Sequence, residues 1–121
     1  MSDKVEFTQL ATELLAKTRA GKIRWIPADY PKMYSTKINK AFTVTVLWEA
    51  DYRKLRHNII LSMLDKKDNL IATVSSNELE KPALLDELYE VVQEQLFQQS
   101  LQRGRNAQYK VKDVFEALSK L

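Results

Sequence analysis

His57 is the residue best suited to proton transfer near neutral pH, and it is the only histidine among the 121 residues. The chain contains no cysteine, which excludes disulfides, thiolate zinc sites and cysteine nucleophiles. A Ser-His-Asp triad or a multi-histidine metal site is hard to build with a single imidazole. His57 follows the basic run Arg53-Lys54-Leu55-Arg56 and has no catalytic partner at a recognisable spacing. We therefore expect a surface residue at the entrance of a strand rather than a catalytic base.

Two short motifs share some letters with ligand-binding loops. Residues 16–23 contain Gly21-Lys22, but a phosphate-binding loop would need glycine at position 16, serine or threonine at position 23, and a strand before a helix. Residues 65–69 carry carboxylates, but a calcium loop would need glycine and glutamate where the chain has Leu70 and Ser76. A hairpin turn is predicted there instead. No cofactor or metal is expected, although the sixteen acidic residues keep a carboxylate- and Mg²⁺-dependent enzyme as the least favoured alternative.

The net charge of +3 conceals a separation of charge along the chain. Residues 17–40 hold seven basic residues against one acidic residue, residues 78–94 hold six acidic residues against one basic residue, and residues 103–112 add four basic residues. Such blocks are candidate interaction surfaces, while the acidic block also fits a solvated helix face that complements the helix dipole. The candidate contact residues are five cations and one loop aromatic: Arg24, Lys37, Lys40, Arg103, Arg105 and Tyr30.

Aromatic residues accompany the basic segment 17–40 and extend just beyond it. Basic groups interleaved with aromatic rings could neutralise phosphates and stack unpaired bases, which makes nucleic-acid binding an alternative function. However, the alternation of Trp25, Tyr34, Phe42 and Trp48 is also what a half-buried strand requires. We favour a position in the core for these four rings.

The N-terminal half changes from a helical period to a period of two. A stripe of residues with helical spacing precedes Gly21 and predicts a helix that ends at this glycine with a left-handed cap. The stripe consists of Phe7, Leu10, Ala11, Leu14 and Thr18. A short strand is expected over 22–26. From Tyr34 to Trp48, the residues expected to share one face of a strand are all even-numbered. Because a two-residue hairpin at Asn39-Lys40 would break this alternation, the pattern favours one long strand over 34–49.

The C-terminal half is predicted to contain two more strands and two helices. Strands over 58–64 and 70–75 are followed by a helix over 82–102, marked by Leu85, Leu88, Val92 and Leu96. Gly104 is expected to separate it from a final helix over 108–121, which is either packed on its own domain, the favoured outcome, or a docking element. The expected fold is a single α+β domain over 1–121: an N-terminal helix, an antiparallel sheet of three to four strands, and two C-terminal helices packed on one face.

Three stretches of the chain together resemble a group of small uncharacterised bacterial and prophage proteins. They are the helix-to-strand segment 12–25, with Lys17-Thr18 and Gly21-Lys22-Ile23-Arg24-Trp25, the pair Leu70-Ile71 after a polar turn, and the helix Leu85-Asp86-Glu87-Leu88-Tyr89-Glu90 followed by Val111–Leu118. The resemblance implies a shared architecture and a prophage or mobile-element setting, and it implies no activity. The segment between Tyr89 and Val111 is longer and richer in glutamine than the pattern of the group.

These observations lead to a functional prediction. The residues before Lys17 include Asp3, Glu6 and Glu13 and no apolar block, so no signal peptide is predicted. The apolar runs are far shorter than the roughly 20 residues that cross a bilayer. We expect a non-enzymatic cytoplasmic protein-interaction module that binds a protein partner or a second copy of itself and no membrane. Nucleic-acid binding through residues 17–40 is the alternative.

Overall fold

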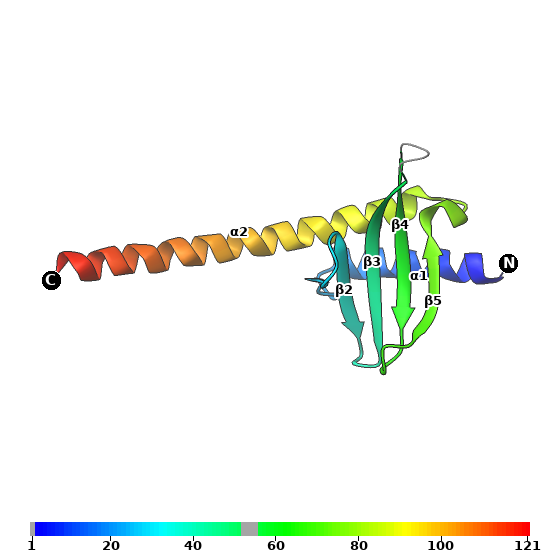
Figure 1. Cartoon of the computed structure of the whole chain (residues 1–121), viewed down its shortest axis with the longest axis horizontal. Helices are drawn as coiled ribbons and strands as arrows, with labels where there is room; N and C mark the ends of the chain where they lie inside the picture. Colours follow the sequence, from blue (N-terminus) through cyan, green and yellow to red (C-terminus); the bar gives the residue numbers. More distant parts are fainter. Residues whose placement is uncertain (1, 52–55) are drawn as a thin grey trace.

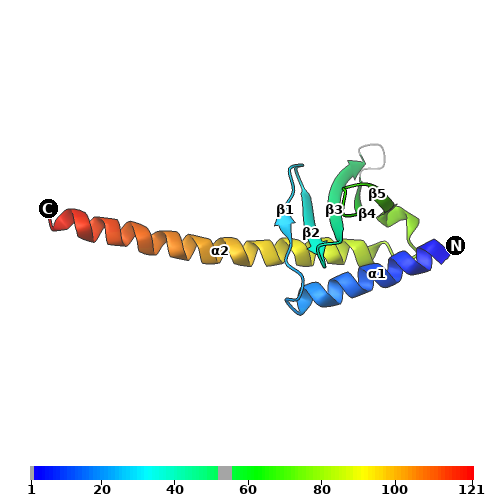
Figure 2. The ribbon, with the colours of Figure 1, turned by 90° about the horizontal axis from the view of Figure 1, so that it is seen from below.

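The computed structural model describes the backbone of residues 2–51 and 56–121, and the side chains of residues 5–50, 56–101 and 112–121. Two helices lie against one face of a five-stranded antiparallel sheet, so the predicted α+β class is confirmed with five strands rather than three to four (Figures 1 and 2). In chain order the elements are α1 (Ser2–Arg19), β1 (Ile26–Pro27), β2 (Met33–Ile38), β3 (Phe42–Asp51), β4 (Arg56–Leu64), β5 (Leu70–Ser75), the short 3₁₀ helix η1 (Ser76–Glu78) and α2 (Ala83–Ser119).

The five strands form a meander in which each strand pairs with its neighbours in sequence order. In the central pairing, Val44 lies opposite Met63 and Val46 lies opposite Leu61. Val44, Val46 and Leu61 are buried beneath the helices. The opposite face is not covered by a helix (Figure 2) and carries a cross-strand row of hydroxyl groups. The alternation of the two faces follows from the period-two geometry of a strand.

The predicted continuous strand over 34–49 is wrong, because a turn divides it at Asn39 and Lys40. Both residues adopt left-handed backbone conformations, with φ of 52° and 58°, and the Ala41 N–H donates to the Ile38 carbonyl at 3.0 Å. Ile38 pairs with Phe42, so residues 39–41 form the connection between β2 and β3. A connection of three residues leaves Ile38 and Phe42 on the same face, and the even parity therefore continues through the turn.

Helix α1 ends where Gly21 predicts. Gly21 has a φ of 73°, its N–H donates to the Thr18 carbonyl at 3.0 Å, and the Lys22 N–H donates to the Lys17 carbonyl at 2.9 Å. These two bonds constitute a Schellman motif, in which a left-handed residue satisfies the last carbonyls of a helix. The motif turns the chain toward Trp25, which is fully buried.

The predicted strand over 22–26 is largely absent, since only Ile26 lies in β1. The segment before β1 is held instead by side chains. The Gln95 amide accepts a hydrogen bond from the Trp25 N–H and donates one to the Ile23 carbonyl, both at 2.8 Å. The Trp25 Nε1–H donates to Thr18 Oγ1 at 2.9 Å. Trp25 therefore joins α1, α2 and the start of the sheet, and its expected place in the core is confirmed.

The hydrophobic core lies between the sheet and the two helices. Its buried members come from α1, the segment before β1, the three strands β3 to β5, the connection after η1 and the first part of α2: Ala11, Leu14, Leu15, Trp25, Val44, Val46, Ile59, Leu61, Val74, Leu79, Leu85, Leu88, Tyr89 and Val92. Tyr34 and Trp48 pack partly buried against it, whereas Phe42 is 48 % exposed. The core assignment therefore fails for Phe42, which lies at the end of the sheet beside the turn.

Two helical elements follow the sheet, but their boundary differs from the prediction. The first is η1, and α2 then runs without interruption through Gly104, from Ala83 to Ser119. The first part of α2 packs on the sheet and α1, and the remainder projects away from the body of the molecule (Figure 1). Residues 112–121 are exposed, so the expectation that a final helix packs on its own domain is wrong. Within the described part of the chain, no helix is both long enough and apolar enough to span a membrane.

Candidate functional site

Four basic residues line a groove beside the end of α1 and the β1–β2 edge of the sheet. Lys17, Lys22, Arg24 and Lys37 border a volume of about 670 Å³, and no acidic residue belongs to its lining. The remaining lining residues are apolar or neutral polar: Ile23, Ile26, Ser35, Thr36, Ile38, Asn39 and Thr43. Four cations in a lining that contains no carboxylate favour a local positive potential, which attracts anions.

Backbone contacts bring these cations together from separate parts of the chain. The Schellman motif at Gly21 brings Lys22 back beside Lys17 at the end of α1, because the Lys22 N–H donates to the Lys17 carbonyl. The Thr36 hydroxyl donates to the Arg24 carbonyl at 2.8 Å, which holds the segment before β1 against β2. Lys37 follows Thr36 on β2 and is exposed. We refer to these lining residues as the basic groove.

Of the four predicted contact residues whose side chains the structure describes, two lie together. Arg24 and Lys37 line the basic groove, whereas Lys40 and Tyr30 do not belong to its lining. Lys40 occupies the turn between β2 and β3, and Tyr30 lies 63 % exposed in the loop before β2. The backbone of Arg103 and Arg105 lies in α2, but their side chains fall outside the described residues.

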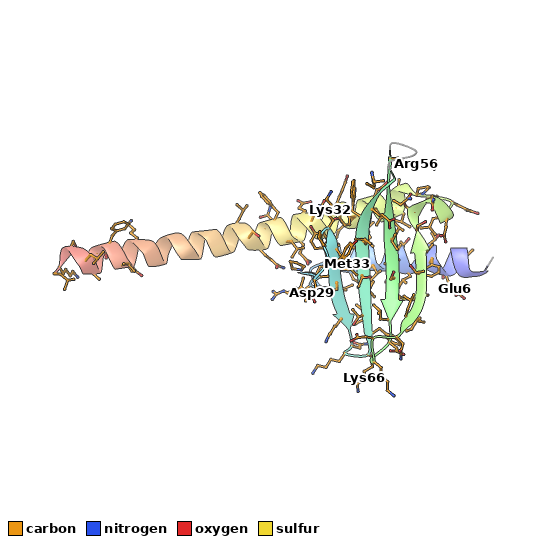
Figure 3. The ribbon with its side chains drawn as sticks, viewed as in Figure 1. Glu6, Asp29, Lys32, Met33, Arg56 and Lys66 are labelled. Carbon is orange, nitrogen blue, oxygen red and sulfur yellow. The ribbon has the colours of Figure 1, made fainter. Side chains whose placement is uncertain are left out.

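A second hollow, of about 300 Å³, lies between the sheet and α2 and contains His57. The Lys32 ammonium sits 4.0 Å from the centre of the Trp48 ring, and the Trp48 and His57 rings stack with centroids 5.4 Å apart. Figure 3 shows Lys32, the residue before the start of β2, beside α2. His57 Nε2 lies 3.0 Å from the Asp86 carboxylate, a partner 29 positions away that sequence spacing did not reveal.

The contacts around this hollow join the sheet to α2. The Tyr89 hydroxyl donates to the Lys32 carbonyl at 2.8 Å. The Tyr34 and Tyr89 rings pack against each other with their centroids 5.5 Å apart. Burial raises the pKa of Tyr89 to about 12, so its hydroxyl remains a hydrogen-bond donor at neutral pH.

Two carboxylates of the acidic segment 78–94 pair with basic side chains of the same chain: Asp86 pairs with His57, and Glu87 pairs with Arg19. These pairs favour a structural role for part of the acidic segment.

The lining of this hollow contains no serine, threonine or cysteine that the imidazole of His57 could activate as a nucleophile. Among the described residues, no group of three or more His, Cys, Asp and Glu side chains is arranged to hold a metal ion. His57 lies near the start of β4 with its side chain 43 % exposed, which agrees with the predicted surface position at a strand entrance.

The projecting part of α2 and the two residues that follow it form a third surface. We define residues 97–121 as the arm. Its described large apolar side chains are exposed by 44 % to 101 %: Phe97, Leu101, Val114, Phe115, Leu118 and Leu121. Phe97 and Leu101 do not belong to the six predicted contact residues. Their signal is the spacing of three and four residues that they share with Phe115 and Leu118 across the whole arm.

No protein-family model, curated protein or solved structure gives a significant match to this chain.

Proposed function

We propose that this protein is a non-enzymatic cytoplasmic interaction module that binds another protein chain through its arm. The observation that carries the proposal is the exposed apolar face of the arm. Phe97, Val114, Phe115 and Leu118 are each between 57 % and 67 % exposed, although they lie on a helix continuous with the folded domain. Val114, Phe115 and Leu118 are neighbours within one helical turn, and an exposed apolar patch of this kind on a monomer marks a site of association.

The conformation of the arm supports the same proposal. Most helical stability in proteins comes from packing of an apolar face rather than from intrinsic helix propensity. Gly104 adds a cost of about 1 kcal/mol relative to alanine within a helix. The described residues of the arm from 112 onward are all exposed, so contacts with the domain do not supply the missing stabilisation. A second chain on the apolar face would supply it.

A site-specific cross-linker tests this proposal directly. Replacing Phe115 with the photoreactive analogue benzoylphenylalanine keeps an aromatic ring at a position that is 67 % exposed. Irradiation in cells is expected to join this position covalently to a protein chain, because a docked partner holds its C–H bonds against the probe. The matched control is the same analogue at Ile71, an exposed apolar residue of β5 that lies outside the arm. Equal protein adducts at the two positions, or none at Phe115, would contradict the proposal.

Nucleic-acid binding in the basic groove is the second candidate function, and the four cations in a lining that contains no acidic residue favour it. Lysine and arginine contacts to phosphates release counterions, so binding of single-stranded nucleic acid weakens as salt rises. Replacing both Arg24 and Lys37 with alanine is expected to reduce the slope of log affinity against log salt by about 1.4. Filter binding with a labelled oligonucleotide over a salt series measures this slope.

The control for the groove variant is a second double alanine variant, at Arg56 and Lys120. It removes the same two side-chain types from exposed positions outside the groove. We expect it to keep the wild-type slope. Affinity that does not change with salt, or an equal loss in both variants, would exclude phosphate binding in the groove.

A further inference from the structure

We infer that the basic groove and an apolar pocket beside it together bind a single-chain lipid with an anionic head group. The pocket takes the aliphatic chain, and the groove takes the head group. This inference goes beyond the proposed function, because it does not involve the arm. It is carried by the continuity of the two linings and by their different chemical character.

The apolar pocket has a volume of about 290 Å³ and lies between α1 and the end of the sheet beside the β2–β3 turn. Leu14 and Val44 are the most deeply buried residues of its lining, whereas Phe42 is 48 % exposed. Glu13 and Lys17 are the charged residues of the lining, and the other lining residues are apolar. A concave, mainly apolar surface with few polar groups is typical of a small-molecule site.

The pocket and the basic groove are continuous, because Lys17, Ile23 and Ile38 belong to both linings. Ile23 and Ile38 are partly buried and pack against the core. The Gln95 amide donates to the Ile23 carbonyl at 2.8 Å, and Lys17 belongs to the last turn of α1. The fold therefore holds the boundary between pocket and groove in place, as expected of a preformed ligand site.

The distribution of charge sets the direction in which such a ligand lies. The lining of the groove holds Lys17, Lys22, Arg24 and Lys37 and no carboxylate. Glu13 lies one helical turn before Lys17 and belongs to the lining of the pocket only. An anionic head group is attracted to the cations of the groove and repelled by the carboxylate at the pocket, so the chain occupies the pocket.

The apolar pocket favours an aliphatic chain over a nucleotide base. The edges of a base carry hydrogen-bond donors and acceptors, and the apolar side chains of the pocket offer them no partners. Polar groups that leave water without gaining a partner are unfavourable. An aliphatic chain has no such groups, and its transfer from water to the pocket is favourable.

A chain-length series tests the pocket in the wild-type protein. Titration calorimetry with hexyl and octyl phosphate, both below the concentrations at which they form micelles, gives the two affinities. Each methylene group removed from water contributes a factor of about 4, so octyl phosphate is expected to bind roughly 15-fold more tightly than hexyl phosphate. Equal affinities of the two, an equal affinity of inorganic phosphate, or no binding of octyl phosphate would overturn the inference.

A pocket variant locates the aliphatic chain. Phe42→Asp places a carboxylate in the lining of the pocket and is expected to weaken both octyl phosphate and the neutral octyl glucoside at least about 10-fold, because an unpaired charge beside the chain is unfavourable. The matched control is Ile71→Asp, which adds the same charge at an apolar residue that is 50 % exposed and lies outside both linings. Equal losses in the two variants would place the chain elsewhere and would overturn the inference.

The groove variant, with alanine at Arg24 and Lys37, locates the head group. It is expected to weaken octyl phosphate at least about 10-fold and to leave octyl glucoside unchanged, because only the phosphate interacts with the cations. The double alanine variant at Arg56 and Lys120 is again the control and should keep both affinities. Equal weakening of octyl phosphate and octyl glucoside in the groove variant would contradict the assigned orientation.

The possible failures are distinguishable from failures of the proposed function. Binding of a single-stranded oligonucleotide without binding of octyl phosphate would leave the groove as a nucleic-acid site and would overturn this inference. Binding of vesicles that contain anionic phospholipid without binding of free octyl phosphate would assign the surface to a membrane and would overturn it as well. Neither result bears on the protein adduct at Phe115, which tests the arm separately.

Discussion

Replacing Trp25 with alanine is expected to lower the free energy of unfolding by about 3–5 kcal/mol, the range for removal of a buried aromatic side chain. Trp25 is fully buried and belongs to the largest side chains of the core. Its indole fills the space between α1 and α2, and its Nε1–H donates to the Thr18 hydroxyl. A small domain has a total stability of roughly 5–15 kcal/mol, so this single change removes a large part of it.

Urea denaturation followed by circular dichroism measures the effect of Trp25→Ala. The matched control is Trp48→Ala, which deletes the same side chain from a partly buried position beside Lys32 and His57. We expect the control to cost roughly 1–2 kcal/mol, because less apolar surface leaves water at Trp48. A loss at Trp25 no greater than the loss at Trp48 would contradict the central position assigned to Trp25.

Replacing Gln95 with leucine is expected to lower the free energy of unfolding by about 2–4 kcal/mol, because it leaves two backbone groups without partners. The Gln95 side chain accepts from the Trp25 N–H and donates to the Ile23 carbonyl, both at 2.8 Å. The segment 22–25 lies outside the strands, so the amide of Gln95 takes the place of a neighbouring strand. Leucine matches the size of glutamine but offers neither a donor nor an acceptor.

The control for Gln95→Leu is Gln98→Leu, one helical turn further along α2, where the side chain is exposed. Exposed substitutions of this kind usually change stability by less than about 0.5 kcal/mol. Urea denaturation gives the difference in stability, and amide hydrogen exchange should show faster exchange at the Trp25 N–H in the Gln95 variant alone. Similar stabilities of the two variants would mean that water satisfies the Trp25 and Ile23 groups equally well.

Local patterns predicted the elements whose signals are complete within a few residues. The helical stripe of α1 and its end at Gly21 follow from apolar spacing and from the left-handed preference of glycine, and the Schellman bonds at Gly21 confirm both. Strands β4 and β5 lie close to their predicted bounds because Asp65 to Asn69 form a tight turn. In that turn, the Asp65 carboxylate accepts hydrogen bonds from the Lys67 and Asn69 N–H groups at 2.9 Å.

The failures occur where one local pattern permits two structures. Even parity from Tyr34 to Trp48 is the same for one strand and for two strands joined by three residues, so it could not reveal the turn at Asn39 and Lys40. Glycine ends α1 at Gly21 but does not end α2 at Gly104. The difference is that capping bonds satisfy the end of α1, whereas the helical apolar period resumes beyond Gly104.

For the candidate sites, the sequence by itself determined the charge blocks, the absence of thiol chemistry and the apolar period of the arm. Only the tertiary structure decided which residues meet. It unites Lys17, Lys22, Arg24 and Lys37 in one groove and leaves Lys40 and Tyr30 outside its lining. It also pairs His57 with Asp86. The reason is physical: helix and strand periods act over a few neighbouring residues, whereas these groupings depend on packing between elements that are distant in sequence.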